Sequence, residues 1–432
     1  MTVYDRWHLT HPREDATPCR CSRGRAKLYP SGDHGSGDRW QVRWREENGK
    51  QCKRNFPKKD GTDADTCAEA FDALITTQLN SDTYVDPDAG KITLGAYAAS
   101  WRAGLTSDLS TLQTVDRHLA HIADLYGKRL RALSKRPSAV QQWISGLQGK
   151  GLAPGTIKVI VGTLSSVFNA AIDDGIIARN PTHAKSVKPP PVPKRKVQPW
   201  TAAQVRGAAA EVETRHSSGA MVFLGAAAGL REGEVFALAE EDVVFLGRDR
   251  RILVRRQVKR VKDGDGVWRL LFAPPKGGKD REVPLSDAMA ARLAAHLKAR
   301  PAVAVTLPWR TPAGKPAAAR LLFTRPGGRA WYGQAFQYTW DKAREAGNAP
   351  DGEDGRFHGL RHTFASACLA DGVDIRTLAD WLGHTDPGFT LRTYTHLMPT
   401  AAARGRRAID TFLAGSADGD SSALNVPQGD QL

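Results

Sequence analysis

The 432-residue sequence has few cysteines, no long apolar run and fewer acidic than basic residues. Its longest apolar stretch, "MVFLGAAAGL", is far shorter than the roughly 20 residues that a membrane helix needs. The opening residues "MTVYDRWHLTHPREDA" carry charges and lack the apolar centre of a secretory signal. We therefore expect a cytoplasmic protein, associated with the nucleoid if it binds DNA, without a membrane partner.

The cysteines are odd in number and scattered along the chain, which does not fit the disulfide framework of an exported domain. They are Cys19, Cys21, Cys52, Cys67 and Cys368. Cys19 and Cys21 lie near His11, but the usual two-residue spacer and a second ligand pair are missing from this grouping. The sequence predicts no metal and no cofactor.

The shortage of acidic residues leaves a net charge of +16, from 62 Lys and Arg against 46 Asp and Glu. A polyanion such as DNA is the first partner to consider, although a chain that is merely basic would show the same excess. The length and the 41% hydrophobic content allow two or three domains.

Residues 40–56, "WQVRWREENGKQCKRNF", alternate apolar and polar positions around Asn48-Gly49, which predicts a β-hairpin. A helix should follow within "DADTCAEAFDALITTQL". Basic residues and aromatics interleave in the hairpin, as in a small sheet that lies in a DNA groove, but a solvated hairpin would look the same. The candidate DNA-binding residues here are Arg43, Arg45, Lys53 and Arg54.

From about residue 92 to 186, apolar residues recur at three- and four-residue steps and predict a helical bundle. The segment 187–200, "VKPPPVPKRKVQPW", is proline-rich and basic, which indicates an extended linker. We expect it to follow the DNA backbone through Lys188, Lys194, Arg195 and Lys196.

Beyond the linker, the sequence predicts helices, then three strands between residues 251 and 285, then helices again from about Asp287. Gly383, Pro387 and Gly388 are expected to break the chain before a fresh helix in "LRTYTHL". The polar tail after residue 414 is expected to be disordered.

Four fragments occur in a fixed order: "GLREGEVFAL", "PPKGGKDREVPL", "HGLRHTFAS" and "LGHTDPGFTLRTYTHL". Together they resemble the tyrosine recombinase family, in particular the phage integrases, over roughly residues 200–410. The resemblance implies a mainly α catalytic domain with a small antiparallel β-sheet, preceded by an all-α core-binding bundle and a small α+β N-terminal arm-binding domain. The expected bounds are 1–88 (arm-binding), 89–186 (core-binding), 187–200 (linker), 201–414 (catalytic) and 415–432 (tail).

Carried over residue by residue, the resemblance makes Tyr394 the nucleophile and His358 its base. The other implied catalytic residues are Arg231, Arg361 and His384, which would bind the scissile phosphate, and Lys276, which would protonate the leaving oxygen. Lys279 is the alternative general acid.

Two neighbours of these residues are expected to have supporting roles. Glu234 follows Arg231 by one helical turn and is expected to orient it by an ion pair, while His362 is expected to be structural or to support a catalytic residue from behind.

The family further implies a homotetramer on double-stranded DNA attachment sites, acting without ATP and integrating a phage or an integrative plasmid. The sequence leaves open whether an excisionase or a DNA-bending host protein takes part. Two rivals remain: a type IB topoisomerase or transposon recombinase with the same chemistry, and a DNA-binding regulator that has kept only the fold.

Overall fold

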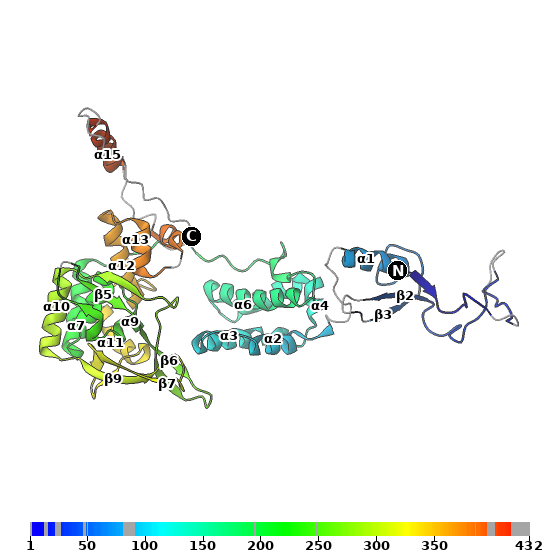
Figure 1. Cartoon of the computed structure of the whole chain (residues 1–432), viewed down its shortest axis with the longest axis horizontal. Helices are drawn as coiled ribbons and strands as arrows, with labels where there is room; N and C mark the ends of the chain where they lie inside the picture. The colour runs from blue at the N-terminus through cyan, green and yellow to red at the C-terminus, as the bar shows by residue number, and fades with distance from the viewer. Residues whose placement is uncertain are drawn as a thin grey trace. The chain divides into compact units, whose positions relative to one another are not determined.

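The computed structural model divides the chain into two units, Met1–Pro193 and Lys194–Leu432 (Figure 1). It describes residues 2–12, 16–21, 27–45, 49, 51–80, 91–193, 196–247, 249–384, 386–394 and 402–415. The expected disordered tail therefore lies outside the described residues, apart from Gly415.

The first unit begins with a three-stranded antiparallel sheet in the order β1-β2-β3. Its strands are β1 (Thr2–Asp5), β2 (Trp40–Arg45) and β3 (Gln51–Phe56), and helix α1 (Ala68–Asn80) packs on one face. Alternation places Val42, Trp44 and Phe56 inward against Phe71 and Ile75 of α1. The predicted hairpin is confirmed, whereas β1 was not expected because its partner strand follows a long loop.

The same unit continues as a helical bundle around a second core. Its elements are α2 (Leu94–Ala103), α3 (Leu109–Ile122), η2 (Ala123–Leu125), α4 (Leu130–Lys135), α5 (Pro137–Gly149), α6 (Pro154–Asp173) and η3 (Pro181–His183). Thr93 and Asp108 cap the first two helices, and prolines open α5 and α6, where no amide donor is missed. Helix α6 is long and apolar enough to cross a membrane by composition, but its residues Ile157, Ile160, Leu164 and Phe168 are buried in the bundle core.

The second unit is rich in helices. They are α7 (Ala202–His216), α8 (Ala220–Ala228), α9 (Glu232–Phe236), η4 (Glu240–Asp242), α10 (Asp287–Ala299), α11 (Gly333–Ala346), α12 (Phe357–Ala370), α13 (Ile375–Leu382), α14 (Pro387–Tyr394) and α15 (Ala402–Gly415). The core of this unit is built from residues of the helices from α7 to α14 and of its strands, but not from the described residues of α15. A capping box between Thr201 and Gln204 opens α7, and α11 and α12 pack on α7 and α8.

Small antiparallel sheets complete this unit. Their strands are β4 (Val243–Val244), β5 (Arg251–Val254), β6 (Gln257–Lys262), β7 (Trp268–Ala273), β8 (Arg281–Pro284), β9 (Val303–Pro308), β10 (Pro316–Leu321), β11 (Thr324–Arg325) and β12 (Arg329–Ala330). The expectation of helices alone after Asp287 is wrong, because β9 and β10 form a hairpin in which Val305 faces Ala319. The coarse fold class, helical with small antiparallel sheets, is as predicted.

The turn between α13 and α14 differs in detail from the expectation. Gly383 ends α13 in the left-handed region at φ 61°, as a C-terminal glycine should. The next helix begins already at Pro387, so Gly388 lies in its first turn instead of breaking the chain before Leu391. A proline is well tolerated at the first helical position, which explains the earlier start.

Candidate active site

A groove in the second unit is lined by three of the residues singled out in the sequence, Arg231, Lys276 and His358. Glu232, Gly233, Gln337, Trp340, Arg344, Arg356 and Phe357 complete its lining. Lys276 is exposed in the turn between β7 and β8, so it can move without disturbing the core. Lys279 is also exposed in this turn but is absent from the lining, so the groove favours Lys276.

A buried carboxylate organises the cations behind this groove. Glu234, 2% exposed, accepts bonds from the Arg231 backbone amide at 2.8 Å and the Arg231 guanidinium at 3.0 Å. It also accepts two bonds from Arg281, at 2.9 and 2.6 Å. Burial alone would raise the pKa of Glu234, but the bonds and charges of Arg281 and Arg231 lower it to about 2. The expected ion pair between Glu234 and Arg231 is present.

Arg281 is a member of the site that the sequence analysis missed. Its Nε donates to the Trp381 carbonyl oxygen at 2.8 Å, which ties β8 to the end of α13. It lies two residues before Val283, a buried residue of the same strand, so both side chains point to one face of β8. A charged residue on the inner face of a strand needs a partner, and that was the available signal.

Arg361 on α12 is 1% exposed and is held by two carbonyl oxygens at helix ends. It donates to Gly229 at 2.7 Å and to Leu382. Burial, with the neighbouring charges of Arg231 and Arg281, lowers the pKa of Arg361 to about 9. Gly229 has φ 61°, and a Cβ there would lie 2.5 Å from Phe364, so only glycine fits.

Tyr394, at the end of α14, is 2% exposed, and its hydroxyl lies 2.6 Å from His362 Nδ1. Burial raises the pKa of Tyr394 to about 12, although Arg361 acts in the opposite direction. From the sequence, His358 was expected to be the base of Tyr394, and His362 was expected to be structural or to support a catalytic residue from behind. In the structure the Tyr394 hydroxyl contacts His362. The His358 ring instead packs edge-on against the His362 ring, with 4.7 Å between the ring centroids.

The three histidines of this region are held neutral. Burial, followed by the positive charge of Arg361 and Arg231, lowers the pKa of His384 to about 4. The pKa values of His362 and of His358 are also lowered, first by desolvation, although His358 keeps an exposed surface at the groove. His384 lies 2.7 Å from the Thr390 hydroxyl of α14, so α13 and α14 are joined beside Tyr394.

Glu232 is a second acidic residue of the groove that the sequence analysis did not consider. Burial raises the pKa of Glu232 to about 7, so this carboxyl group is partly protonated at neutral pH. The same groove therefore brings together cations, a neutral histidine and a carboxyl group that titrates near pH 7.

The candidate DNA-binding residues of the N-terminal sheet separate onto two faces. Arg43, Arg45 and Lys53 are exposed, and Arg43 lies opposite Lys53 in the register. Arg54 lies on the other face, 5.0 Å above the rings of Phe56 and of Phe71.

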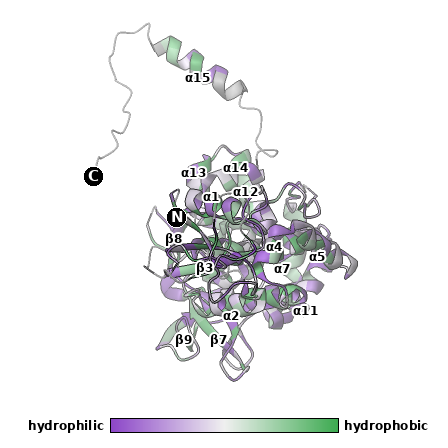
Figure 2. Ribbon diagram, turned by 90° about the vertical axis from the view of Figure 1, so that its right-hand side faces the viewer, coloured by the Kyte–Doolittle hydropathy of each residue, from purple (hydrophilic) through white to green (hydrophobic). Residues whose placement is uncertain are grey.

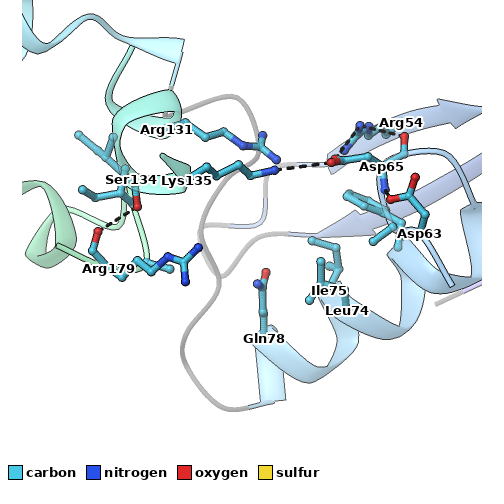
Figure 3. A pocket seen from close by; sticks show the side chains of 15 residues that line it. Arg54, Asp63, Asp65, Leu74, Ile75, Gln78, Arg131, Ser134, Lys135 and Arg179 are labelled. Atoms are coloured by element: carbon cyan, nitrogen blue, oxygen red, sulfur yellow. Dashed lines mark hydrogen bonds and ion pairs between the residues drawn. The ribbon is translucent and has the colours of Figure 1, made fainter. Parts of the chain in front are cut away.

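Arg54 also lines a pocket of the first unit, where it pairs with Asp65 at 3.6 Å (Figure 3). Lys135 reaches the same carboxylate at 3.5 Å. Arg54 is therefore engaged on the inner face of the sheet. The other three basic residues share the exposed face, where Arg43 donates to Gln41 at 2.6 Å and lies 4.8 Å from the Tyr4 ring.

Two of the four basic linker residues are described. The side chains of Lys188 and Lys196 are exposed, and the Lys188 backbone amide donates to Gln141 at 2.7 Å. Lys194 and Arg195 lie outside the described residues. Among the described residues, the side chains close enough to share a metal ion are His8, Cys19, Cys21 and His34, none of which lines the groove.

Comparison with known proteins gives this arrangement a context. Residues 201–400 match the profile of the phage integrase family. The chain is 25% identical to a tyrosine recombinase XerC-like protein of Caldanaerobacter subterraneus, over 82% of this chain and 90% of the relative. It is 26% identical to an integrase of Mycobacterium phage L5, over 75% of this chain and 83% of the relative.

Solved structures agree with the fold. The Tn1549 transposon integrase in complex with a circular intermediate DNA matches with a TM-score of 0.60 and 22% identity, covering 73% of this chain and 99% of that one. A lambda integrase dimer bound to a core site matches with a TM-score of 0.50 and 16% identity, covering 70% of this chain and 95% of that one. This chain therefore has the fold of these integrases.

Proposed function

We propose, from the premise that the chain belongs to the tyrosine recombinase (phage integrase) family, that it cuts and rejoins DNA through a 3′-phosphotyrosyl intermediate and a Holliday junction. Site-specific DNA recombination is the activity of this family, and the resemblance in the sequence motifs agrees with it. The proposed outcome is integration of a phage genome or another mobile element into a host chromosome. The observation that carries the proposal is a buried tyrosine hydroxyl bonded to a neutral histidine within a cluster of guanidinium groups.

In this mechanism Tyr394 attacks the scissile phosphate, and a histidine accepts the phenolic proton. His362 supports this role by its 2.6 Å contact, and its lowered pKa leaves the imidazole free to take a proton at neutral pH. His358 borders the groove beside Arg231 and is proposed to contact the phosphate or to replace His362 as the base once DNA is bound. The bond that forms is Tyr394 Oη–P, and the bond that breaks joins phosphorus to the 5′ oxygen.

The developing negative charge requires cations placed in advance. Arg231 and Arg361 are proposed to bind the non-bridging oxygens, and His384 to donate a further hydrogen bond. Glu234 and Arg281 support this assignment because they fix the Arg231 guanidinium without neutralising the whole cluster. No ATP is needed, because the phosphotyrosyl bond keeps the energy of the broken phosphodiester.

Lys276 is proposed as the general acid that protonates the leaving 5′ oxygen. It lines the groove with Arg231, whereas Lys279, on the same turn, does not. Lys276 follows Pro275 directly and precedes two glycines at positive φ, so the turn lets the ammonium approach a bound backbone.

DNA attachment sites are the proposed substrate. The open sheet face with Arg43, Arg45 and Lys53 supports an arm-site contact, since like charges placed opposite one another are unfavourable without a polyanion. The basic linker with Lys188 and Lys196 is proposed to follow the phosphate backbone. The proposed domains remain 1–88 (arm-binding), 89–186 (core-binding), 187–200 (linker), 201–414 (catalytic) and 415–432 (tail).

A homotetramer on DNA is the proposed assembly. Helix α15 supports it, because Ile409, Phe412 and Leu413 are 59, 66 and 61% exposed, and their spacing gives one apolar stripe. Apolar and polar residues follow one another along this helix (Figure 2). The proposed location is the cytoplasm, on the nucleoid.

The deciding experiment is covalent trapping on a suicide substrate made from the element's own junction sequences. Tyr394→Phe should bind this DNA normally but form no adduct. Tyr338→Phe is the matched control, since Tyr338 is exposed on α11 and should keep full activity. An adduct with Tyr394→Phe would refute the assignment. Relaxation of supercoiled DNA that lacks an attachment site would instead favour a topoisomerase.

A further inference from the structure

Four metal-binding side chains converge in the long loop between β1 and β2. The donor atoms of His8, Cys19, Cys21 and His34 all lie within 4.8 Å of one another. His8 Nε2 lies 3.1 Å from Cys19 Sγ, and Cys21 Sγ lies 3.5 Å from His34 Nε2. Two thiols and two imidazoles thus surround one point.

These separations agree with a tetrahedral zinc ion. Zn–S bonds of about 2.3 Å and Zn–N bonds of about 2.0 to 2.1 Å place neighbouring ligand atoms about 3.3 to 3.8 Å apart. The two short distances lie at or near this range, and the 4.8 Å limit for the other pairs needs only a small contraction. Two thiolates with two imidazoles are a ligand set that selects zinc.

The contacts of His8 prepare it as a ligand. Its Nδ1 lies 2.8 Å from Asp5 Oδ2, so the ring donates its proton there and turns the lone pair of Nε2 toward Cys19. Arg39 holds Asp5 in turn, with its closest bond at 2.7 Å. A carboxylate behind a histidine ligand is the usual support of a zinc site.

The backbone fixes the positions of the ligands. His8 forms a β-bridge with Pro30, and the Cys19 amide donates to the Leu28 carbonyl at 2.8 Å. These pairings draw the parts of the loop that carry the ligands together.

The described residues of the loop form no apolar core of their own. Among the described residues between Asp5 and Trp40, His8 alone is buried, at 7% exposure. A loop of this length needs another source of order, and a structural metal supplies it in small domains.

We propose that His8, Cys19, Cys21 and His34 form a closed structural zinc site that orders this loop and, through β2, the sheet face of Arg43. The proposal replaces the sequence-based expectation of no metal, which had grouped Cys19 and Cys21 with His11; His11 is exposed and is not part of the cluster. The site lies outside the set of residues proposed for catalysis, and its failure would leave the recombination chemistry unaffected.

The test is metal analysis of the full-length protein after purification and dialysis. We expect about one zinc per chain. We also expect cobalt substitution to produce thiolate-to-metal charge-transfer absorption, which Cys21→Ser should remove. Cys19→Ser and His34→Ala should lose zinc, whereas Cys52→Ser and His11→Ala should keep it.

His34→Cys separates metal binding from folding. It keeps a four-ligand zinc set and should retain the metal that His34→Ala loses. Zinc retained in a Cys19→Ser/Cys21→Ser double variant would overturn the proposal. So would a protein that takes up no zinc in competition with a weak chelator, or an intact mass lower by two hydrogens, which indicates a Cys19–Cys21 disulfide.

Discussion

The Glu234 carboxylate bonds to both Arg231 and Arg281 and so fixes these two cations at the candidate active site. Each of its oxygens accepts two bonds: Oε1 from the guanidinium groups of Arg231 and Arg281, Oε2 from the Arg231 amide and from Arg281. In Glu234→Gln, an amide NH2 replaces one oxygen and faces two donors. The single negative charge among Arg231, Arg281 and Arg361 is lost at the same time.

The size of the effect follows from burial. The Glu234 side chain is 0% exposed and that of Arg281 is 7% exposed, so removing the charge leaves a buried cation unpaired. Breaking such a pair costs about 3 to 5 kcal/mol, and we expect Glu234→Gln to destabilise the second unit by about this amount. Replacing Arg281 by Met in the same chain should recover part of the loss, because it removes the unpaired cation.

Hydrogen exchange followed by mass spectrometry measures the loss of stability in each segment separately. A local measurement is needed because a chain of two units does not unfold in one step. Amides of α9 and β8 should lose protection in Glu234→Gln and regain part of it in the double variant. Glu241→Gln is the control, since its pair with Arg256 spans 3.6 Å and Glu241 is 42% exposed. If Glu234→Gln lowers the free energy of unfolding by less than about 1 kcal/mol, the buried ion pair does not hold this region together. A double variant less stable than Glu234→Gln would also refute this role of the pair.

The remaining predictions concern protons and DNA. Because the folded pKa of Glu232 is raised to about 7, its carboxyl ionises as pH rises from 6 to 8 and should weaken DNA binding; Glu232→Gln should flatten this dependence in a fluorescence anisotropy titration. If His362 is the base, His362→Asn should slow adduct formation by about 100-fold or more in single-turnover assays. A smaller loss in His358→Asn agrees with this assignment. A loss of this size in His358→Asn, with His362→Asn still active, would refute it. Arg43→Ala should reduce the magnitude of the slope of log affinity against log salt for arm-site DNA by about 0.9, whereas Arg54→Ala should leave the slope unchanged. Equal slopes for the unmodified protein and both variants would contradict the assignment of Arg43 and Arg54 to different faces of the sheet.

Periodicity predicted the helical bundle of the first unit well, because its core is filled by residues at three- and four-residue steps, as in Ile157, Ile160 and Leu164 of α6. It failed for β9 and β10. Their inward residues include Ala319, and alanine-rich segments favour helices when read locally. The hairpin forms because pairing with β9 buries that alanine together with Val305, a tertiary effect that no local pattern contains.

The ordered motifs contain the residues that line the groove, Arg231, Lys276 and His358, but they did not predict the contacts around it. His358 and His362 lie on one helix, and only the position of α14 decides which ring meets Tyr394. Arg281 carried a readable signal, a charge on the inner side of a strand, but its partner Glu234 lies far away in sequence. The cluster around His8 was similarly hidden, because a β-bridge and not a short spacer brings its ligands together.

The electrostatics of the site indicate how the proposed nucleophile is restrained without DNA. Burial raises the pKa of Tyr394 to about 12, so the phenol keeps its proton, while the nearby histidines are neutral because burial and the arginines disfavour a further positive charge. A bound phosphate would bring negative charge among these arginines and raise the pKa of the histidines. Proton transfer from Tyr394 to His362 would then become more favourable at the moment when the phosphate is in place. On this reasoning the bound phosphate completes the base, and the buried Tyr394 is proposed to act as the nucleophile once the phosphate is in place.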